Sequence, residues 1–453
     1  MTDGWRLALR NLRRNRRRNG ATALGIALGF AGLSILGGYV TRIELFLRTN
    51  TVYLQHGGHV AVYHAEGLEK AGARPARYSL TATDQVAIRR ALEGDPRVEY
   101  SAGYLRGMGL AGNGCRTVPF AALGIDPGVL QRNVRQPDVR RISADFVRPV
   151  RGGQLFDYLD VDGAVGLAAG LARLLGKTRT HDDFGGPAAA VVVPDCGSPE
   201  ATAQIAGDAN VQLAALSFDG ALAAIDGEVV NVFHTPTTDT EDQTLYTTLS
   251  TLQRLYSTDA VTYVAVYLKK WREAEPFARD LEARLRGVGL GVVAYPFTDE
   301  RVSPYYVGSM TFLQSMVVFI VLLVASVVVL GVMNTGTLTV YERSREIGTF
   351  RAVGYTRSQV TGLFLREVTL LSAAGLAGGL ALSHAVATGV RLANIRISPP
   401  GVPGTLQVVL TPGPAVYLAL VALLLPLSIL VTWLVVRRRL QERTADLLTA
   451  TTA

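Results

Sequence analysis

Charge and cysteine are both scarce in this 453-residue chain. Asp, Glu, Lys and Arg together make up only 18% of the sequence, against 49% hydrophobic residues, and only two residues are cysteine. That balance is too apolar for an ordinary soluble enzyme. Charged residues are absent altogether from the windows 21–41, 308–333, 368–390 and 416–436. Each window is long enough to cross a hydrocarbon core of about 30 Å as a helix, so four membrane spans are predicted.

The sequence patterns of catalysis are also missing. No H-E-x-x-H, G-x-S-x-G or C-x-x-C pair occurs, and the phosphate-loop-like stretch GLARLLGKT has Leu171 where the spacing requires glycine. His56, His59 and His64 lie close together, but no cysteine or carboxylate set accompanies them, so ordinary surface histidines are favoured over a metal site. No catalytic residue, metal or cofactor is therefore assigned to this chain.

The distribution of basic residues predicts the orientation of the spans. Segments 1–20, 334–367 and 437–453 together contain 16 Lys and Arg against 6 Asp and Glu, while the remainder contains 29 against 31. Positively charged loops stay in the cytoplasm. Both termini and the 334–367 loop are therefore expected inside, with residues 42–307 and the short 391–415 loop outside. The net charge of +8 then reflects membrane topology and gives no reason to expect a nucleic-acid partner.

The N-terminal residues 1–20 are predicted to form an amphipathic helix on the membrane surface. Trp5, Leu9 and Leu12 follow helical spacing, and arginines on the other side would face lipid headgroups. A topology signal without an ordered helix is the alternative. The first span has a longer apolar core than a signal peptide, and no A-x-A site follows it, so it is expected to stay as an anchor.

The long outer segment, 42–307, is predicted to be a mixed α/β domain. Its β-branched and aromatic runs predict strands at 58–64, 188–194, 227–234 and 260–268. Helices are expected at 81–94, starting from Thr83 or Asp84 as N-cap, and at 272–289. The second helix lies between two predicted strands, 260–268 and 291–295, in a βαβ-like unit.

Cys115 and Cys196 both fall in this outer domain. An oxidising compartment would permit a disulfide between them. Two cysteines alone do not establish one, so bridged and unbridged states both stay open.

Glycines at helical spacing are expected to bring membrane helices close together. Gly25 and Gly29 lie in the first span, and Gly375 and Gly379 lie in the third. Small residues let helix backbones approach closely in lipid, where van der Waals packing replaces the hydrophobic effect. The partner is either another helix of the same chain or a second membrane chain, and the sequence leaves both open.

Span two is longer than a membrane requires. From Val307 to Val340 the pattern stays compatible with a helix for over 30 residues, about 50 Å at 1.5 Å per residue. Part of this helix is expected to project beyond the membrane as a stalk leading to the 334–367 loop.

The 334–367 loop itself is predicted to be a helix, a tight break and a second helix. Residues 341–352 favour a helix, Gly354 can supply the left-handed stop, and Thr356 with Gln359 forms a capping box. Ile347 and Phe350 are apolar residues with little core of their own to enter. They would rest on the bilayer or serve as a docking knob for a partner protein.

These residues carry a resemblance to a known family. The stretch ERSREIGTFRAVGYTRSQV, at 342–360, resembles the E-R-x-R-E-I-G-x-x-R-A-x-G signature of bacterial ABC-transporter permeases of the FtsX, MacB and LolC/LolE superfamily. LALRNLRRNRRRNGATALGIALGFA, at 7–31, is similar to the family's opening. AALGIDPG (121–128) and TLYTTLSTLQRLYS (244–257) resemble its outer domain more loosely. The order of one span, a large outer domain and three spans also matches.

The resemblance implies a non-catalytic subunit whose 341–354 helix couples to a separate ATPase. The matching motif positions are Glu342, Arg343, Arg345, Glu346, Gly348, Arg351, Ala352 and Gly354, to which Ile347 and Phe350 are added as docking candidates. Implied partners are two ABC ATPase subunits carrying ATP and Mg²⁺, a second permease chain, membrane lipids and a periplasmic acceptor or adaptor. A bacterial inner-membrane location is implied, with movement of the outer domain driven by ATP hydrolysis.

The task implied by the resemblance is lipoprotein release, with MacB-like efflux of peptides or small amphiphiles as the alternative. MacB-type proteins carry a fused N-terminal ATPase, whereas only 20 residues precede the first span here, so the ATPase is expected on another polypeptide. FtsX-type outer domains are smaller, so size favours the LolC/LolE or stand-alone MacB-like branches. A signalling receptor with a sensory outer domain is the rival from another class.

Overall fold

The computed structural model describes residues 2–14, 16–143, 146–147, 163–177, 205, 207–235, 237–398, 401 and 404–441. The chain divides into two compact units. The membrane unit comprises Met1–Glu44, Met310–Ile395 and Gln407–Ala453. The extramembrane domain comprises Leu45–Ser309 and Arg396–Leu406.

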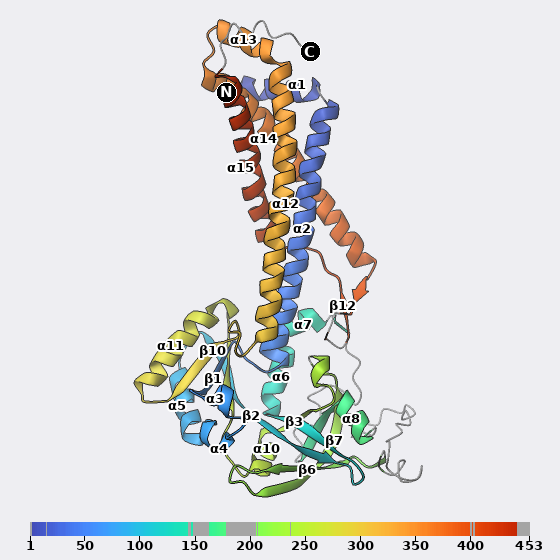
Figure 1. The fold of residues 1–453 in the computed structure, drawn as a ribbon, viewed down its shortest axis with the longest axis vertical. Helices are drawn as coiled ribbons and strands as arrows, with labels where there is room; N and C mark the ends of the chain where they lie inside the picture. The colour runs from blue at the N-terminus through green and yellow to red at the C-terminus, as the bar shows by residue number, and fades with distance from the viewer. Residues whose placement is uncertain are drawn as a thin grey trace. The chain divides into compact units, whose positions relative to one another are not determined.

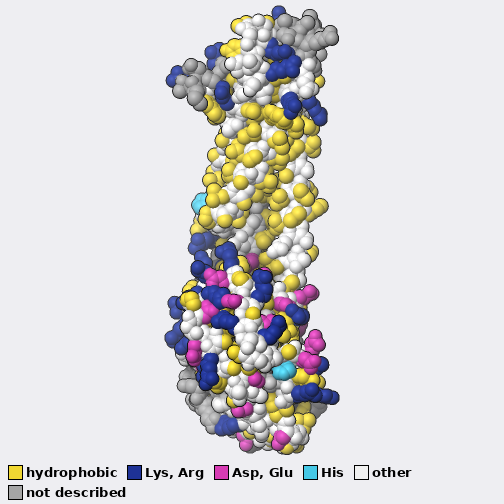
Figure 2. Space-filling view, turned by 90° about the vertical axis from the view of Figure 1, so that its left-hand side faces the viewer, with side chains coloured by type: hydrophobic (Ala, Val, Ile, Leu, Met, Phe, Trp, Pro, Cys, Tyr) yellow, Lys and Arg dark blue, Asp and Glu magenta, His cyan; other side chains and the backbone are white. Residues whose placement is uncertain are grey.

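Six helices carry the membrane unit (Figure 1): α1 (Thr2–Arg14), α2 (Arg16–Thr49), α12 (Pro304–Glu342), α13 (Ser344–Ala352), α14 (Arg357–Leu392) and α15 (Pro414–Arg439). Four of them, α2, α12, α14 and α15, are long and apolar enough to cross a membrane, which confirms the four predicted spans. Figure 2 shows hydrophobic side chains as a band along these helices, with Lys and Arg gathered beyond it at the end that carries α1 and α13. At 39 residues, α12 is about 60 Å long.

Glycines of α14 pack directly on α2. A Cβ added to Gly375 would lie 2.9 Å from the carbonyl oxygen of Ala23, and one added to Gly379 would lie 2.7 Å from that of Ala27. On the other side of α2, a Cβ at Gly29 would meet two α12 valines at 3.1 Å. Three of the four predicted packing glycines therefore serve contacts within this chain. A Cβ at Gly25 would meet no described atom within 4 Å.

The extramembrane domain contains a split βαβ arrangement. Its elements are β1 (Val60–His64), α5 (Ala82–Leu92), β2 (Val98–Gly112), β9 (Tyr263–Leu268), α11 (Ala274–Gly287) and β10 (Val292–Pro296). The strand order is β10-β1-β9-β2, and β1 is antiparallel to both β9 and β10. The predicted βαβ-like unit is present, but β1 lies between its two strands. This connectivity, βαββαβ, is ferredoxin-like.

The long strand β2 also belongs to a closed ring of six strands. From β2 the pairing runs through β3 (Thr117–Ile125), β8 (Thr244–Thr248), β5 (Ala164–Ala168), β7 (Leu222–Phe233) and β6 (Asn210–Leu216), and β6 pairs back to β2. Helices α8 (Ala169–Leu175) and α10 (Leu249–Tyr256) contribute Leu171 and Leu252 to the apolar core of this ring. Closure leaves these strands without a free sheet edge.

Short elements complete the domain. They are the π-helix η1 (Asn50–Leu54), the 3-10 helices η2 (Thr238–Thr240) and η3 (Trp271–Glu273), the helices α3 (Gly67–Lys70), α4 (Pro75–Tyr78), α6 (Pro127–Arg135) and α7 (Pro137–Ser143), and the small sheet β11 (Arg396–Ile397), β12 (Thr405–Gln407) and β4 (Phe146–Val147). The predicted strand at 188–194 lies outside the described residues.

The structure corrects two predicted helix starts. The N-cap of α5 is Thr81, whose hydroxyl oxygen accepts from the Asp84 amide while the Asp84 carboxylate accepts from the Thr81 amide. Asp84 is therefore the third helical residue of a capping box, and neither it nor Thr83 is the cap.

The N-terminal amphipathic helix is α1, and a separate helix, α2, begins at Arg16. Trp5 and Leu9 lie on the exposed side of α1.

Two of the three clustered histidines are buried, which is contrary to the expectation of surface residues. His56 is 1% exposed and His59 is 3% exposed. The His59 Nδ1 accepts from the amide of Leu268 at 3.0 Å, and His56 Nδ1 lies 3.2 Å from the side-chain nitrogen of Asn133. Burial lowers the pKa of both histidines to about 3, and Arg48 adds to the effect at His59. Among the described residues no cluster of His, Cys, Asp and Glu could hold a metal ion.

These histidines predict that the extramembrane domain loses stability in mild acid. Both stay neutral in the folded state, whereas the unfolded chain takes up protons below a pH of about 6.5. The free energy of unfolding should therefore fall by about 1.4 kcal/mol per pH unit and per histidine between about pH 6.5 and pH 3. Denaturant unfolding can be followed by fluorescence of Trp271, which lies against Phe297, after Trp5→Phe and Trp433→Phe.

A histidine variant separates this effect from other titrations. His59→Asn keeps an acceptor for the Leu268 amide and removes one titrating group, so the pH slope should fall by about half. His64→Asn makes the same substitution at the half-buried end of β1 and is the matched control. An unchanged slope in His59→Asn would contradict the assignment.

Candidate functional site

The candidate site is built around the short helix α13 at one end of the membrane unit. The helix ends in a Schellman motif, in which the Gly354 amide donates to Arg351 and the Tyr355 amide donates to Phe350. Gly354 has the required positive φ, 100°. The rings of Phe350 and Tyr355 lie 5.3 Å apart across the motif. The turn is therefore fixed by backbone and side-chain contacts.

The next helix starts immediately after this turn. Thr356 caps α14, and both hydrogen bonds of the Thr356–Gln359 capping box are present. On the other side of α13, α12 runs on to Glu342, and only Arg343 separates the two helices. The predicted helix, break and helix is therefore observed, with one more break, at Arg343, than the sequence indicated.

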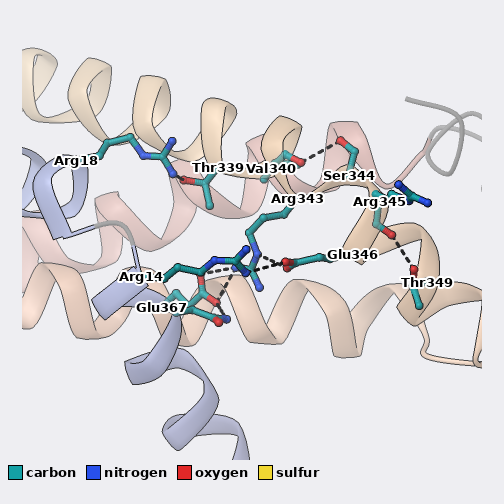
Figure 3. A network of polar contacts seen from close by, with 11 residues as sticks. Arg14, Arg18, Thr339, Val340, Arg343, Ser344, Arg345, Glu346, Thr349 and Glu367 are labelled. Carbon is teal, nitrogen blue, oxygen red and sulfur yellow. Dashed lines mark hydrogen bonds and ion pairs between the residues drawn. The ribbon is translucent and has the colours of Figure 1, made fainter. Parts of the chain in front are cut away.

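Arg343 is the centre of the polar contacts shown in Figure 3. Its guanidinium donates to both carboxylate oxygens of Glu367 at 2.9 and 3.0 Å, and to Glu346 at 2.8 Å. It also lies over the Phe364 ring, 5.1 Å from the centroid. Burial alone would lower the pKa of Arg343, but Glu367 and Glu346 more than offset this and raise it. Arg343 therefore ties the start of α13 to α14.

The N-terminal helix joins the same cluster. Asn11 of α1 donates to Glu367 at 2.6 Å, and Arg14 pairs with Glu346 at 3.2 Å. We call these five residues the polar hub: Asn11, Arg14, Arg343, Glu346 and Glu367. They line a cavity of about 250 Å³. The hub links α1, the α12–α13 junction, α13 and α14.

A second set of contacts joins α2 to the end of α12. Arg18 pairs with Glu342 at 2.6 Å and donates to the Thr339 hydroxyl at 3.0 Å. One turn further, the Thr22 and Thr335 hydroxyls are 2.6 Å apart. Arg14, one of the arginines expected to face lipid headgroups, thus binds Glu346 of α13, and Arg18 binds the end of α12.

Ile347 is buried in an apolar core, which corrects the expectation that this helix has little core for Ile347 and Phe350 to enter. It is 1% exposed and belongs to a small apolar cluster, with Phe350 packed partly against it. The other buried members of the cluster are Val340, Val360, Phe364, Val436 and Leu440. The contact surface proposed from the sequence for Ile347 and Phe350 is therefore turned mainly towards α12, α14 and α15.

The outward side of α13 carries other residues. Val353 is 76% exposed and Tyr355 is 50% exposed. Arg345, Thr349 and Ala352 are also exposed. We call this set of five residues the open face. It combines a cation, small side chains and two exposed apolar groups, a composition that suits a protein contact.

The predicted coupling residues divide between these two sides. Glu342, Arg345, Ala352 and Gly354 are exposed, Arg343, Glu346, Phe350 and Arg351 are half-buried, and Ile347 and Gly348 are buried. Glu367 was missed by the sequence reasoning, although it lies directly before the charge-free window 368–390. A lone carboxylate at the start of a predicted span was the available signal. Cys115 lies in the β2–β3 turn, but Cys196 lies outside the described residues, so their bridge stays a prediction.

The site holds and presents a helix and offers no arrangement for catalysis among its described residues. Its ion pairs hold α13 in place from one side, and its open face lies on the other. Together with four candidate spans and a large α/β domain between the first two, this defines a polytopic membrane protein.

Comparison with known proteins gives a family match over part of the chain. Residues 318–444 match the family model described as FtsX-like permease C-terminal, a segment that includes α13, α14 and α15. This part of the chain is therefore similar to FtsX-like permeases.

Two curated relatives support this assignment over short segments. A macrolide export ATP-binding/permease protein MacB of Nitrobacter winogradskyi is 40% identical over 63 residues, 14% of this chain and 10% of that protein. A pyoverdine export ATP-binding/permease protein PvdT of Pseudomonas putida is 39% identical over 69 residues, 15% of this chain and 11% of that protein. The matched segments thus span about a tenth of each relative.

Solved structures also match part of the chain. The periplasmic region of MacB from Actinobacillus actinomycetemcomitans is 12% identical, with a TM-score of 0.31, over 53% of this chain and 89% of that structure.

Proposed function

We propose that the chain is the transmembrane subunit of an ABC transporter, in which a separate ATPase docks on the open face of α13. ATP hydrolysis would then move α13 and, through α12 and α2, the extramembrane domain. The observation that carries the proposal is the two-sided construction of α13. Its inner side is fixed by the polar hub and the Ile347 cluster, and its outer side is exposed and partly apolar.

The orientation and partners follow from the same proposal. We expect the basic end with α1 and α13 to face the cytoplasm, with both termini inside and the extramembrane domain outside. We expect two ATPases and a second permease chain, in a homo- or heterodimer. The apolar side of α12, with Phe319 and Leu322 more than 60% exposed, and the open backbone at Gly25 suit such a helix–helix contact.

Two kinds of cargo compete within this proposal. Lipoprotein release from the inner membrane is one, and efflux of peptides or small amphiphiles is the other. Both matched relatives are named as exporters, which favours efflux. A signalling receptor would use the same α13 contact without ATP turnover.

The docking step is tested by a charge placed on the open face. Val353→Asp should reduce the ATPase recovered with the tagged permease at least tenfold, because burying an unpaired carboxylate at an interface costs more than about 1.4 kcal/mol. The measurement is co-purification with each ATPase encoded in the same genome, followed by ATP turnover of the complex.

Val288→Asp is the matched control. Val288 is 69% exposed in the extramembrane domain, so the same chemical change should leave ATPase recovery and turnover unaltered. If Val353→Asp retained a full complement of ATPase, α13 would not be the docking site. If the permease bound a partner but ATP turnover played no part in its output, the receptor would replace the transporter.

A further inference from the structure

The extramembrane domain contains a second feature that the proposed function does not use, a large cleft. It has a volume of about 1200 Å³ and is lined by residues of the α3–α4 segment and of the strands β2, β3 and β6. That volume exceeds the roughly 300–1,000 Å³ typical of pockets for drug-sized ligands. The cleft therefore has room for a large molecule or a long chain.

One wall of the cleft is an apolar strip on the outer face of the strand ring. Leu110 of β2 is directly opposite Ala214 of β6, and Leu216 of β6 is directly opposite Leu222 of β7. Side chains two residues apart on a strand share a face, so Met108 continues the strip from Leu110. Met108, Leu110, Leu216 and Leu222 are 67%, 49%, 66% and 79% exposed. Four large apolar side chains that are exposed side by side are typical of a binding surface.

The charges in the cleft have one sign. Arg74 and Arg77 come from the α3–α4 segment and Arg106 from β2, and no Asp or Glu is among the lining residues. The Arg106 guanidinium lies 5.0 Å from the centre of the Tyr263 ring. Among the described residues, no carboxylate forms an ion pair with any of these three arginines. On the face of the domain shown in Figure 2, Lys and Arg are interspersed with Asp and Glu.

Arg106 also connects the cleft to an aromatic recess. A smaller cavity of about 50 Å³ shares Arg106 and Tyr63 with the cleft and is lined further by Tyr295 and Phe297. Arg106 lies two residues before Met108 on the same outer face of β2. The cationic and apolar parts of the cleft are therefore adjacent along one strand.

We propose that this cleft binds an anionic amphiphile, with a carboxylate or phosphate group on Arg74, Arg77 and Arg106 and an acyl chain on the Met108–Leu222 strip. Guanidinium groups bind both anions through charge-assisted hydrogen bonds. An uncharged apolar ligand would leave the three arginines without an anionic partner, and an acidic peptide without an acyl chain would leave the apolar strip exposed. The proposal that the cleft binds this ligand does not depend on the proposed transport function. The further proposal that the cleft takes up cargo does rest on that function.

The experiment uses the full-length chain in nanodiscs of zwitterionic lipid, without any ATPase. The probe is dodecyl phosphate with a photoactivatable diazirine in its chain, and labelled peptides are mapped by mass spectrometry. We expect label on the peptides that contain Met108 and Leu216. Unlabelled dodecyl phosphate should compete for this label, whereas dodecyl maltoside, with the same chain and no charge, should compete at least tenfold less well.

Removing the three cationic groups tests the charge recognition. The variant Arg74→Gln, Arg77→Gln, Arg106→Gln should lose labelling at least tenfold. Arg89→Gln, Arg90→Gln, Arg279→Gln makes the same change of charge on exposed residues of α5 and α11 and should label like the wild type. Trp271 fluorescence verifies that both variants are folded.

Three results would overturn the proposal. They are label confined to the membrane helices, equal competition by dodecyl maltoside, and loss of label in the control triple variant to the same degree as in the cleft variant. Because no ATPase is present, such a failure leaves the docking proposal for α13 untouched, and failure of docking leaves this binding result untouched.

Discussion

Replacing Glu367 by alanine is expected to release α13 from its place on the membrane unit. Glu367 is 8% exposed and accepts two hydrogen bonds from Arg343 and one from Asn11. Without it the half-buried Arg343 keeps Glu346 as its one carboxylate partner among the described residues, and breaking a buried ion pair from one side costs about 3–5 kcal/mol. Amide hydrogen exchange of residues 344–352 in nanodiscs should therefore speed up by about two orders of magnitude or more.

The loss should also uncouple the transporter. An α13 helix that moves independently of α14 can still bind an ATPase through Val353 and Tyr355, but it passes on less of the displacement. We therefore expect Glu367→Ala to retain ATPase binding and to lose ATP-driven output, the reverse of the pattern expected for Val353→Asp. These two variants thus separate the positioning role of the hub from docking on the open face.

Two further variants control this experiment. Glu342→Ala removes a neighbouring carboxylate that is half-exposed and pairs with Arg18, so its effect on exchange should stay below about 1 kcal/mol. Arg343→Met combined with Glu367→Leu replaces the pair by apolar groups and should recover most of the protection. Exchange in Glu367→Ala that matches the wild type would show that the Ile347 cluster alone holds α13.

Local sequence signals were sufficient for much of this architecture. The four spans follow from charge-free windows, and the turn after α13 follows from Gly354 and the Thr356–Gln359 pair. Each of these depends on residues within a few positions of one another. Hydrogen bonds of caps and the length of an apolar run are local properties, so they can be read without knowing the rest of the fold.

The features that the sequence reasoning missed depend on distant residues. Ile347 is buried in one apolar cluster with Phe364 of α14 and Val436 of α15. No sequence pattern near position 347 indicates these distant neighbours. The split of the predicted βαβ unit by β1 joins residues more than 200 positions apart. His59 lies in this same region, between neighbouring strands, which explains why a polar residue just before a strand was misjudged as exposed.

Gly379→Val is expected to have the second largest effect, because it tests the contact between α14 and α2. A Cβ at position 379 would lie 2.7 Å from the Ala27 carbonyl oxygen and 3.0 Å from the Phe30 Cβ, so the two helix backbones would have to separate. Overpacking of this kind costs about 1–3 kcal/mol, and more where backbone cannot yield. Van der Waals contact is what holds helices together in lipid, so a wider gap is not compensated by burial elsewhere. Thermal unfolding of the detergent-solubilised protein should start at a clearly lower temperature.

The neighbouring glycine gives the matched control. A Cβ at Gly378 would meet only the Ala27 Cβ among described atoms, at an ordinary 3.7 Å. Gly378→Val is therefore expected to be neutral or slightly stabilising, since valine in place of glycine restricts the unfolded chain. If both variants lowered the unfolding temperature equally, the effect would stem from bulk anywhere on α14, as in a contact with a second chain along its exposed side. If only Gly379→Val did so, the close approach of α14 to α2 would be the contact that holds this end of the bundle together.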